Sequence, residues 1–521
     1  MDSVEDLDWK RVAEIDRQED ARAGGVLGSA ADGRYGDYLK EGYQPADLRR
    51  ERPSEEVLEL VPEQVARRYR VLPLRVRDGY LEVAASAPSQ QLSNLLALRV
   101  RRPVRFRVAP EAELDRAIAT YYSRVVAVPE EAPGADDTWA ARAVDAFLQG
   151  ALKARASDVH LDPQEGEVLV RYRIDGLLHD AGTIPPEHYP AVVSRVKVLA
   201  GMNVVEHLLP QDGQLVFEGP GRRVDVRVST IPSVRGEKVV MRVLDRGRVS
   251  FDLGALGFEP GALTAYREVV GRAHGMVLVV GPTGSGKTTT LYSTLGELDL
   301  RGLNVMTLED PVEYQFPRVV QVQVNPKAGL TFAAGLRAFL RQDPDVIVVG
   351  EVRDAETARI AVQAALTGHL VLSSLHAMDA VSGLLRLVDM GVEPYFVAAA
   401  VTGVVAQRLV RRICADCSEE REVSGPEAEF VRAAGLEAPA RARVGTGCAA
   451  CAGTGYRGRT GVYEVLRVTE EVRSLVAHGG GREAVHRAAL SGGMQPLVRA
   501  ALAKALRGET TVREVVRVLS G

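Results

Sequence analysis

Short apolar runs alternate with helical stretches in the second half of the chain. The runs "MVLVVG", "NVMTLED", "VIVVGE" and "HLVLSSLH" show no regular apolar/polar alternation. Strands of this kind are typical of a mainly parallel sheet that is buried on both faces. The segments between them, such as "TTTLYSTLGEL" and "AETARIAVQAALTG", are predicted helices. The pattern therefore predicts an α/β core over residues 259–400.

Apolar and polar residues alternate more strictly between residues 137 and 248. A predicted helix over 138–156 leads into "SDVHLDPQEGEVLVRYRIDGLLHD", which has the alternation of a β-meander. A second set of alternating strands follows over 214–244. These patterns predict a separate α+β domain over 137–248, rich in antiparallel strands.

The first part of the chain mixes both patterns. "VLPLRVRDGYLEVAAS" predicts two strands around a turn, whereas "QLSNLLAL" and "EAELDRAIATYY" predict helices. The segment 128–137 is rich in Pro, Gly and acidic residues and is a predicted linker. We therefore expect a small module within residues 1–127, while the order of residues 1–50 stays open.

The composition is that of an ordinary globular protein. The chain has 521 residues, 46% of them hydrophobic and 26% charged, and at ~150 residues each this suggests about three or four domains. A net charge of −4 gives no general attraction to nucleic acid, and the arginine-rich "RVRRPVRFRV" is better explained as an edge strand with a solvated face. No secretory signal and no run of ~18 apolar residues is present. We expect a cytoplasmic protein that reaches the membrane only through partners.

The strongest chemical signal is "GPTGSGKTTT", which follows an apolar strand and opens a helix. It has the form G-x-x-x-x-G-K-T of a phosphate-binding loop. The glycines let backbone N–H groups turn toward phosphate oxygens, and a helix N-terminus favours negative charge. Lys287 would reach the β- and γ-phosphates of ATP, and the Thr288 hydroxyl would bind Mg²⁺. The predicted nucleotide-binding residues of the loop are Gly281, Pro282, Thr283, Gly284, Ser285, Gly286, Lys287, Thr288 and Thr289.

Acidic residues follow two other predicted strands. Glu351 comes directly after "VIVVG", and Glu309, Asp310 and Glu313 follow "VMTL". Carboxylates at the ends of strands beside a phosphate-binding loop can activate water or hold a hydrated metal ion. A solvated acidic turn is the alternative for each group.

All four cysteines lie in two C-x-x-C pairs. These are Cys414 with Cys417 and Cys448 with Cys451. Four thiolates suffice for a closed tetrahedral Zn²⁺ site, and a reducing compartment disfavours stable disulfides. A redox pair, two disulfides and an iron–sulfur cluster are the alternatives. We predict one structural zinc ion per chain.

Four blocks occur in order along the chain: "GPTGSGKTTT", "VMTLEDPVEY", "LRQDPDVIVVGEVRDAETA" and "TGHLVLSSLHA". Over residues 137–521 the chain resembles the secretion ATPase superfamily, specifically the assembly ATPases of type II secretion systems and type IV pili. The resemblance implies a RecA-like P-loop NTPase core preceded by α+β, PAS-like modules. It also implies a C-terminal zinc-binding subdomain with a helical tail over 401–521, and assembly into a homohexamer.

The resemblance also implies roles for individual residues. Glu351 would be the main catalytic carboxylate, and Glu309 would help to position water. Arg227 and Arg242 would bring positive charge to the reacting phosphate, and Arg173 would contact the nucleotide. A cationic group in this position can raise the rate by ~10³- to 10⁵-fold. Taken singly, each arginine could equally be a solvated strand residue.

Two histidines stand on either side of the predicted strand "LVLSSL". His369 and His376 are seven residues apart, which puts them on opposite faces of an extended segment, so a shared metal site is not expected. The resemblance implies that His376 senses the γ-phosphate, and a buried structural role is the alternative. Relatives commonly have Thr-Asn where this chain has Ala377 and Met378, which puts the coupling of hydrolysis to motion in question.

The function implied by the resemblance is an ATP-driven motor that assembles a pseudopilus for type II protein secretion. A type IV pilus assembly motor, including one for DNA uptake, is the alternative. A nucleic-acid motor and a binding protein with a degenerate loop are weaker alternatives. The implied partners are further copies of the chain, an inner-membrane platform protein, and a membrane-anchored cytoplasmic adaptor contacted by residues 1–127. Binding of a cyclic dinucleotide through residues 24–43 stays open.

Overall fold

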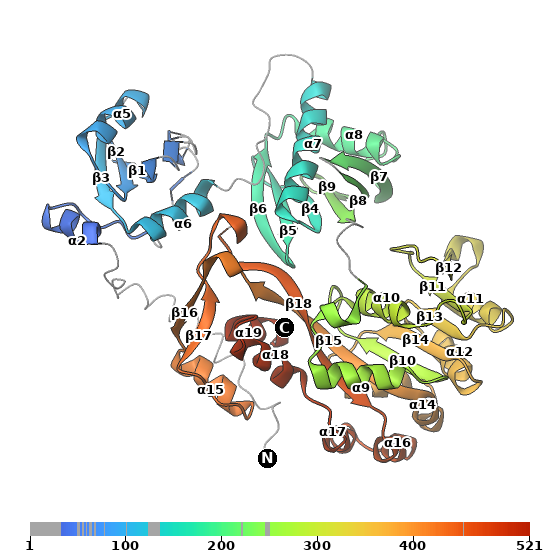
Figure 1. The fold of residues 1–521 in the computed structure, drawn as a ribbon. Helices are drawn as coiled ribbons and strands as arrows, with labels where there is room; N and C mark the ends of the chain where they lie inside the picture. Colours follow the sequence, from blue (N-terminus) through green and yellow to red (C-terminus); the bar gives the residue numbers. More distant parts are fainter. Residues whose placement is uncertain are drawn as a thin grey trace.

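The structure is a computed structural model (Figure 1). It describes residues 33–520, with gaps at 49–52, 55–56, 59, 62–64, 67–68, 78, 101, 123–135, 220–221, 245–250 and 452. The described strands form sheets of seven, six, three and two strands. The two larger sheets carry the candidate active site.

A seven-stranded sheet forms the centre of the ATPase half of the chain. Its order is β12-β11-β13-β14-β10-β15-β18, and all neighbours are parallel except β15 and β18, which are antiparallel. The strands are β10 (Gly275–Val280), β11 (Val305–Glu309), β12 (Val319–Gln323), β13 (Val346–Val349), β14 (Leu370–Leu375), β15 (Val401–Ile413) and β18 (Tyr456–Arg467).

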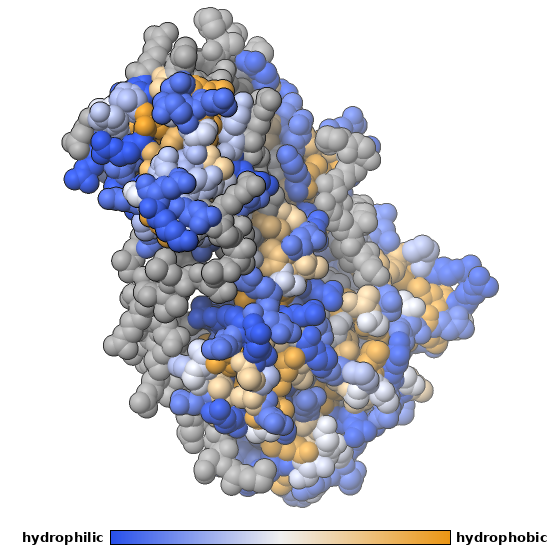
Figure 2. All heavy atoms as spheres, turned by 60° about the vertical axis from the view of Figure 1, so that its left-hand side comes forward, coloured by the Kyte–Doolittle hydropathy of each residue, from blue (hydrophilic) through white to orange (hydrophobic). Residues whose placement is uncertain are grey.

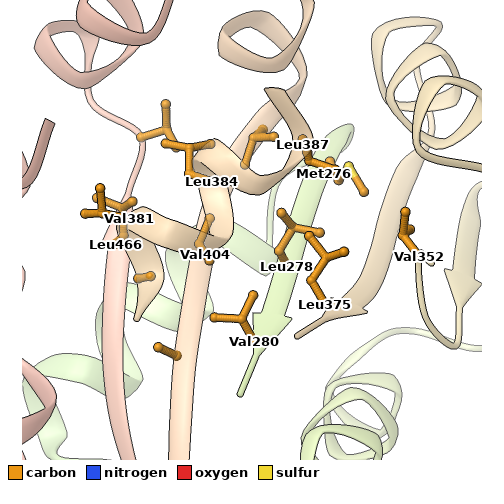
Figure 3. Close-up of a cluster of buried hydrophobic side chains, with 14 of the residues drawn as sticks. Met276, Leu278, Val280, Val352, Leu375, Val381, Leu384, Leu387, Val404 and Leu466 are labelled. Carbon is orange, nitrogen blue, oxygen red and sulfur yellow. The ribbon is translucent and has the colours of Figure 1, made fainter. Parts of the chain in front are cut away.

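Helices cover both faces of this sheet, which explains the continuous apolar runs in the sequence. One face packs on α9 and α10 through a cluster that includes Tyr266 and Leu291. The other face packs on α11–α14, and Figure 3 shows Leu278 of β10 and Leu384 of α13 in this second cluster. The helices are α9 (Pro260–Val270), α10 (Lys287–Glu297), α11 (Phe332–Phe339), α12 (Ala355–Leu366), α13 (Ala380–Asp389) and α14 (Pro394–Ala400).

The seven-stranded sheet continues beyond residue 400, where the sequence places a domain boundary. β15 and β18 are integral strands of it, so the segment that carries the cysteines is inserted between two strands of the core sheet. This insertion contains the pair β16 (Ser418–Glu422) and β17 (Arg441–Gly445) and the helix α15 (Gly425–Ala433). The helical tail consists of α16 (Glu470–Ala477), α17 (Arg482–Ser491), α18 (Leu497–Leu506) and α19 (Val512–Leu519).

The second large sheet is antiparallel, with the order β6-β5-β4-β9-β8-β7. Its strands are β4 (Asp158–Pro163), β5 (Val168–Ile174), β6 (Leu177–Ile184), β7 (Gln211–Gly219), β8 (Arg222–Ser233) and β9 (Gly236–Leu244). One face packs on α7 (Asp136–Ala154) and α8 (Tyr189–Leu199) through a single apolar cluster. The alternation in the sequence thus gives one apolar face and one charged face, as expected for an antiparallel sheet.

The N-terminal sheet has the order β1-β2-β3. β1 (Val71–Arg77) and β2 (Tyr80–Ala85) form the predicted hairpin, and α5 (Gln90–Val100) and α6 (Glu111–Tyr122) are the predicted helices. The arginine-rich segment supplies β3 (Val104–Val108), which is an edge strand parallel to β2. The short helix α2 (Gly33–Lys40) precedes this sheet. Residues 24–32 of the proposed cyclic-dinucleotide segment lie outside the described residues.

The side of the molecule in Figure 2 is largely hydrophilic. Figure 2 shows one side of the molecule, where hydrophobic residues lie in small groups among hydrophilic ones. Among the described helices, none combines the length and the apolar character needed to cross a membrane.

Candidate active site

The phosphate-binding loop connects β10 to α10, as the sequence predicts. Gly284 and Gly286 have φ angles of 77° and 91°, in the left-handed region that favours glycine. A Cβ on Gly281 would lie 2.6 Å from both the carbonyl oxygen of Gln407 and Ser285 Oγ, so a side chain does not fit there. Gly286 is the N-cap of α10, so the first backbone N–H groups of this helix are available to an anion in the loop.

Lys287 is held inside the loop by backbone oxygens. Its Nζ donates to the carbonyl oxygens of Gly281 at 2.9 Å and Pro282 at 3.1 Å. Partial burial lowers the pKa of Lys287, the charge of Glu351 opposes this shift, and the nearby Arg408 adds to it. An anionic phosphate would be a stronger partner for this ammonium group than two carbonyl oxygens.

The other polar groups of the loop also suit a triphosphate with its metal ion. Ser285 Oγ is buried and has no hydrogen-bond partner within the described chain. Thr288 is exposed on the first turn of α10, where its hydroxyl can reach a metal ion at the phosphates. Pro282, Thr283 and Gly284 form the exposed tip of the loop. The residues present therefore fit the predicted ATP and Mg²⁺.

The predicted acidic and histidine residues gather at the same edge of the sheet as this loop. Glu309 is the last residue of β11, Glu351 follows β13 by two residues, and His376 follows β14 directly. Because these strands are parallel to one another and to β10, their carboxyl ends all meet the phosphate-binding loop.

Glu351 is accessible at this edge, with its side chain 20% exposed. The carboxylate forms an ion pair with Arg353, and it lies 3.9 Å from His376 Nε2. Its charge also acts on Lys287. This places one carboxylate and one imidazole side by side at the edge of the sheet that carries the phosphate-binding loop.

Glu309 differs from Glu351 because it is buried and fully hydrogen-bonded. Its carboxylate accepts from the hydroxyls of Tyr292 and Thr307 and from Gln321 Nε2 at 3.0 Å. Burial, together with the Glu309 charge, raises the pKa of Tyr292, which therefore stays a hydrogen-bond donor. The sequence did not single out Tyr292, although its position five residues after Lys287 puts it on the helix of the phosphate-binding loop.

The two histidines are separated by the length of β14. His369 precedes the strand, and its Nδ1 contacts the carbonyl oxygen of Ala364 at 2.9 Å. His376 follows the strand with its side chain 56% exposed, which agrees better with a role at the nucleotide than with a buried structural role. Met378, which stands where relatives commonly have Asn, contacts Arg408. Arg408 Nη2 donates to the carbonyl oxygen of Met378 at 2.9 Å.

Buried polar residues of β15 and β18 support the site, and the sequence analysis missed them. Gln407 accepts from Thr290 on α10 at 2.8 Å and donates to the carbonyl oxygen of Ser285 at 2.6 Å, so it braces the phosphate-binding loop. Burial lowers the pKa of Arg408, against the effect of the Glu464 charge. The sequence signal that could have identified them is the polar pair Gln407 and Arg408 within the apolar run "VVAQRLV".

Glu464 of β18 connects the site to the helical tail. Its two carboxylate oxygens accept from the backbone N–H groups of Ala380, at the start of α13, and Leu497, at the start of α18. Burial raises the pKa of Glu464 to about 7, although these two hydrogen bonds oppose the shift. α13 begins four residues after His376, so one side chain joins the segment after His376 to the tail.

The three predicted arginines lie side by side on the charged face of the six-stranded sheet. Arg173 of β5 pairs in register with Asp158 of β4, Asp158 with Arg242 of β9, and Arg242 with Arg227 of β8. We call these three arginines the arginine row. Residues directly opposite on adjacent strands share a face of the sheet.

The arginine row contacts the ATPase core through Arg227. Arg227 Nη1 donates to Glu313 Oε1 at 3.0 Å, and Nη2 lies 3.0 Å from Oε2 as an ion-pair contact without hydrogen-bond geometry. Glu313 belongs to the loop after β11, and its backbone N–H donates to the Tyr292 hydroxyl at 3.3 Å. Arg227 therefore lies next to the loop that follows Glu309, whereas the phosphate-binding loop follows a different strand, β10.

The four cysteines form one compact cluster. Their sulfur atoms all lie within 4.8 Å of one another. Three of the sulfur–sulfur distances are 3.8, 3.8 and 3.7 Å, which matches the edge of about 3.8 Å of a tetrahedron with Zn–S bonds of ~2.3 Å. A disulfide would need ~2.05 Å. The cluster fits a Cys₄ metal site and none of these pairs is a disulfide.

Backbone amides around the cluster favour thiolate ligands. The N–H groups of Gly447, Cys448 and Gly455 donate to cysteine sulfurs at 3.1 to 3.3 Å. Such hydrogen bonds stabilise the negative charge that a metal ligand carries.

The purified protein is expected to contain one equivalent of zinc. Elemental analysis by mass spectrometry measures this directly, and Cys448→Ser is expected to lower the zinc content because it removes one of four ligands. Ser418→Ala is the control and should retain the metal, because the half-buried Ser418 follows Cys417 directly but offers no thiolate. A protein with iron in place of zinc, or with no metal, would contradict the prediction.

The comparisons with known proteins agree with this site. Residues 134–517 match the family model described as type II/IV secretion system protein, and residues 41–127 match the model of the MshEN domain. The type IV pilus assembly ATPase PilB of Thermus thermophilus is 41% identical over 500 residues, which cover 91% of this chain and 56% of that protein. The type II secretion system protein E of Xanthomonas campestris is 40% identical over 472 residues, which cover 87% of this chain and 83% of that protein.

A solved structure supports the fold. The ATPase DotB of Legionella pneumophila matches with a TM-score of 0.55 over 74% of this chain and 97% of that chain, at 21% identity. The family model covers well over half of the chain, and the resemblance inferred from the four sequence blocks is confirmed. The chain belongs to the type II/IV secretion system protein family and is an ATPase of that family.

Proposed function

We propose that this chain is a cytoplasmic homohexameric motor that hydrolyses ATP to assemble a pseudopilus for type II protein secretion. The observation that carries the proposal is the gathering of Lys287, Glu351 and His376 at one edge of a parallel sheet. The family match and the relatives named for secretion and for pilus assembly support the same function.

In this proposal each residue has a defined task. Lys287 and the N-terminal N–H groups of α10 bind the phosphates, and Thr288 holds Mg²⁺, which offsets the charge that develops during phosphoryl transfer. Glu351 orients and polarises the attacking water. His376, beside Glu351, donates a hydrogen bond to the γ-phosphate.

The arginine row supplies the remaining positive charge. Its ion pair with Glu313 already connects the 137–248 domain to the core. We propose that ATP strengthens this closed arrangement and that phosphate release weakens it. Repeated around a ring, these changes would move a bound partner. The RecA-like character of the core, the PAS-like character of the N-terminal modules and the four domain ranges belong to the same proposal.

The partners are proposed from the family and from the domain order. Further copies of the chain would complete the ring. An inner-membrane platform protein and a membrane-anchored cytoplasmic adaptor would bind it, the adaptor through the module within residues 1–127. Binding of a cyclic dinucleotide by that module stays open.

Deletion of the gene, scored for secreted enzymes and for surface pili, tests the proposed role. We expect secretion to be lost and surface piliation to be retained. Loss of pili with normal secretion would instead support the alternative of a type IV pilus motor, since a relative of that name matches most of this chain. Stimulation of ATP turnover by DNA would contradict both and support a nucleic-acid motor.

A further inference from the structure

Asp158 occupies a special position in the arginine row. It lies on the central strand β4, and its direct neighbours on both sides are arginines, Arg173 on β5 and Arg242 on β9. Asp158 is 4% exposed, so its charge is almost fully removed from water. A buried carboxylate needs such partners, and here both partners are residues with a proposed role in hydrolysis.

The two carboxylate oxygens of Asp158 contact different neighbours. Oδ1 accepts from Arg242 Nε at 2.9 Å. Oδ2 accepts from the Ser157 hydroxyl at 2.7 Å and lies 3.7 Å from Arg173 Nε. Arg242 is therefore held by the Nε side of its guanidinium, whereas Arg173 makes only an ion-pair contact with Asp158 and donates from Nη1 to the carbonyl oxygen of Gly176 at 3.0 Å. The terminal nitrogens of Arg242 remain available, because its side chain is 63% exposed.

Charge explains why the row needs this carboxylate. Arg242 and Arg227 are directly opposite each other on β9 and β8, and like charges in that relation repel. Asp158 compensates Arg242 from one side, and Glu313 compensates Arg227 from the other. Three arginines and two acids leave one positive charge in excess. The row thus stays ordered and still attracts an anion.

We propose that Asp158 is a positioning residue that holds Arg242 in the orientation needed at the nucleotide phosphates. The proposal rests on the proposed ATPase function of the chain. Without the carboxylate, the Arg242 guanidinium would regain rotamer freedom and move away from Arg227, which lies directly opposite. Fewer molecules would then present it correctly, and catalysis is sensitive to such displacement.

The test compares Asp158→Asn with Asp162→Asn in the full chain. Asp162 is a matched control because it lies on the same strand and face, is also 4% exposed, and pairs with Arg171 and Lys238, which lie outside the arginine row. We expect Asp158→Asn to lower kcat by about 10- to 100-fold with KM for ATP changed by less than about threefold. Asp162→Asn is expected to keep kcat within about twofold of wild type.

A double-mutant cycle separates positioning from stability. If Asp158 acts through Arg242, the variant Asp158→Asn/Arg242→Ala should be no slower than Arg242→Ala alone. Equal losses of kcat in Asp158→Asn and Asp162→Asn would overturn the proposal, because a structural role predicts that result. An unchanged or higher kcat in Asp158→Asn would overturn it as well.

Wild-type turnover is measured first, as phosphate release from MgATP. If the wild-type chain releases no phosphate, the proposed function itself fails. If it does and the two Asn variants behave alike, only the role of Asp158 fails.

Discussion

Replacing Glu351 with Gln is expected to lower ATP turnover by about 10²- to 10⁴-fold while ATP binding is retained. Gln has nearly the same shape as Glu but cannot accept a proton from the attacking water. The Glu351 carboxylate lies at the end of β13, within 3.9 Å of His376 Nε2 and at the edge of the sheet that carries the phosphate-binding loop. Phosphate release measures turnover, and calorimetric titration with a non-hydrolysable ATP analogue measures binding.

The matched control for this variant is Glu356→Gln. Glu356 lies five residues further on, in the first turn of α12, where its 59% exposed side chain pairs with Arg337. Its removal should leave turnover close to that of the wild type. A Glu351→Gln protein with normal turnover would refute the assignment of Glu351, and the buried Glu309 would then be the next candidate.

Replacing Lys287 with Ala is expected to lower turnover by about 10²- to 10³-fold and to weaken ATP binding as well. The ammonium group is the main cation inside the phosphate-binding loop, and it is held there by the carbonyl oxygens of Gly281 and Pro282. Removing it leaves the loop with backbone N–H groups and the Ser285 and Thr288 hydroxyls, but without a positive side chain. The same two assays, turnover and analogue titration, should both change, in contrast to Glu351→Gln.

Lys327→Ala provides the comparison for this variant. Lys327 is an exposed lysine in the short 3₁₀ helix Pro326–Ala328, away from the phosphate-binding loop, and its loss should change neither assay. Equal behaviour of Lys287→Ala and Lys327→Ala would show that the loop does not bind ATP. The chain would then be a binding protein with a degenerate loop.

The sequence was informative where one local pattern defines the chemistry. The phosphate-binding loop is continuous in sequence, and its glycines are required by backbone geometry that the structure shows at Gly281 and Gly286. Glu309, Glu351 and His376 follow apolar runs, and parallel strands necessarily bring such positions to one edge. The cysteine cluster was equally clear, because two C-x-x-C pairs contain every cysteine of the chain.

Features that depend on the pairing of distant strands could not be predicted from a local sequence pattern. The resemblance suggested Arg173, Arg227 and Arg242 singly, but their alignment depends on the registers of β4 with β5 and β9 and of β8 with β9. The importance of Asp158 follows only from that alignment. The resemblance also gave Glu309 a role in positioning water. Its hydrogen-bond donors Tyr292 and Gln321 lie on a helix and a strand that the sequence pattern does not connect with Glu309.

The boundary expected at residue 400 shows a related difficulty. The apolar run that ends α14 continues into β15, so the sequence shows a change of element there but cannot show which sheet the new strand joins. In the structure β15 joins β10, and β18 returns beside it after the inserted cysteine segment.

Strand β15 also connects the two ligand sites of the chain by a single uninterrupted piece of backbone. Gln407 contacts the phosphate-binding loop, and Cys414 follows seven residues later, about 23 Å along an extended strand. Between these points β15 pairs only with β18, because its pairing with β10 ends at Ala406. The pairing with β18 continues to Ile413, one residue before Cys414, so a hydrogen-bonded pair of strands joins the phosphate-binding loop to the cysteine cluster.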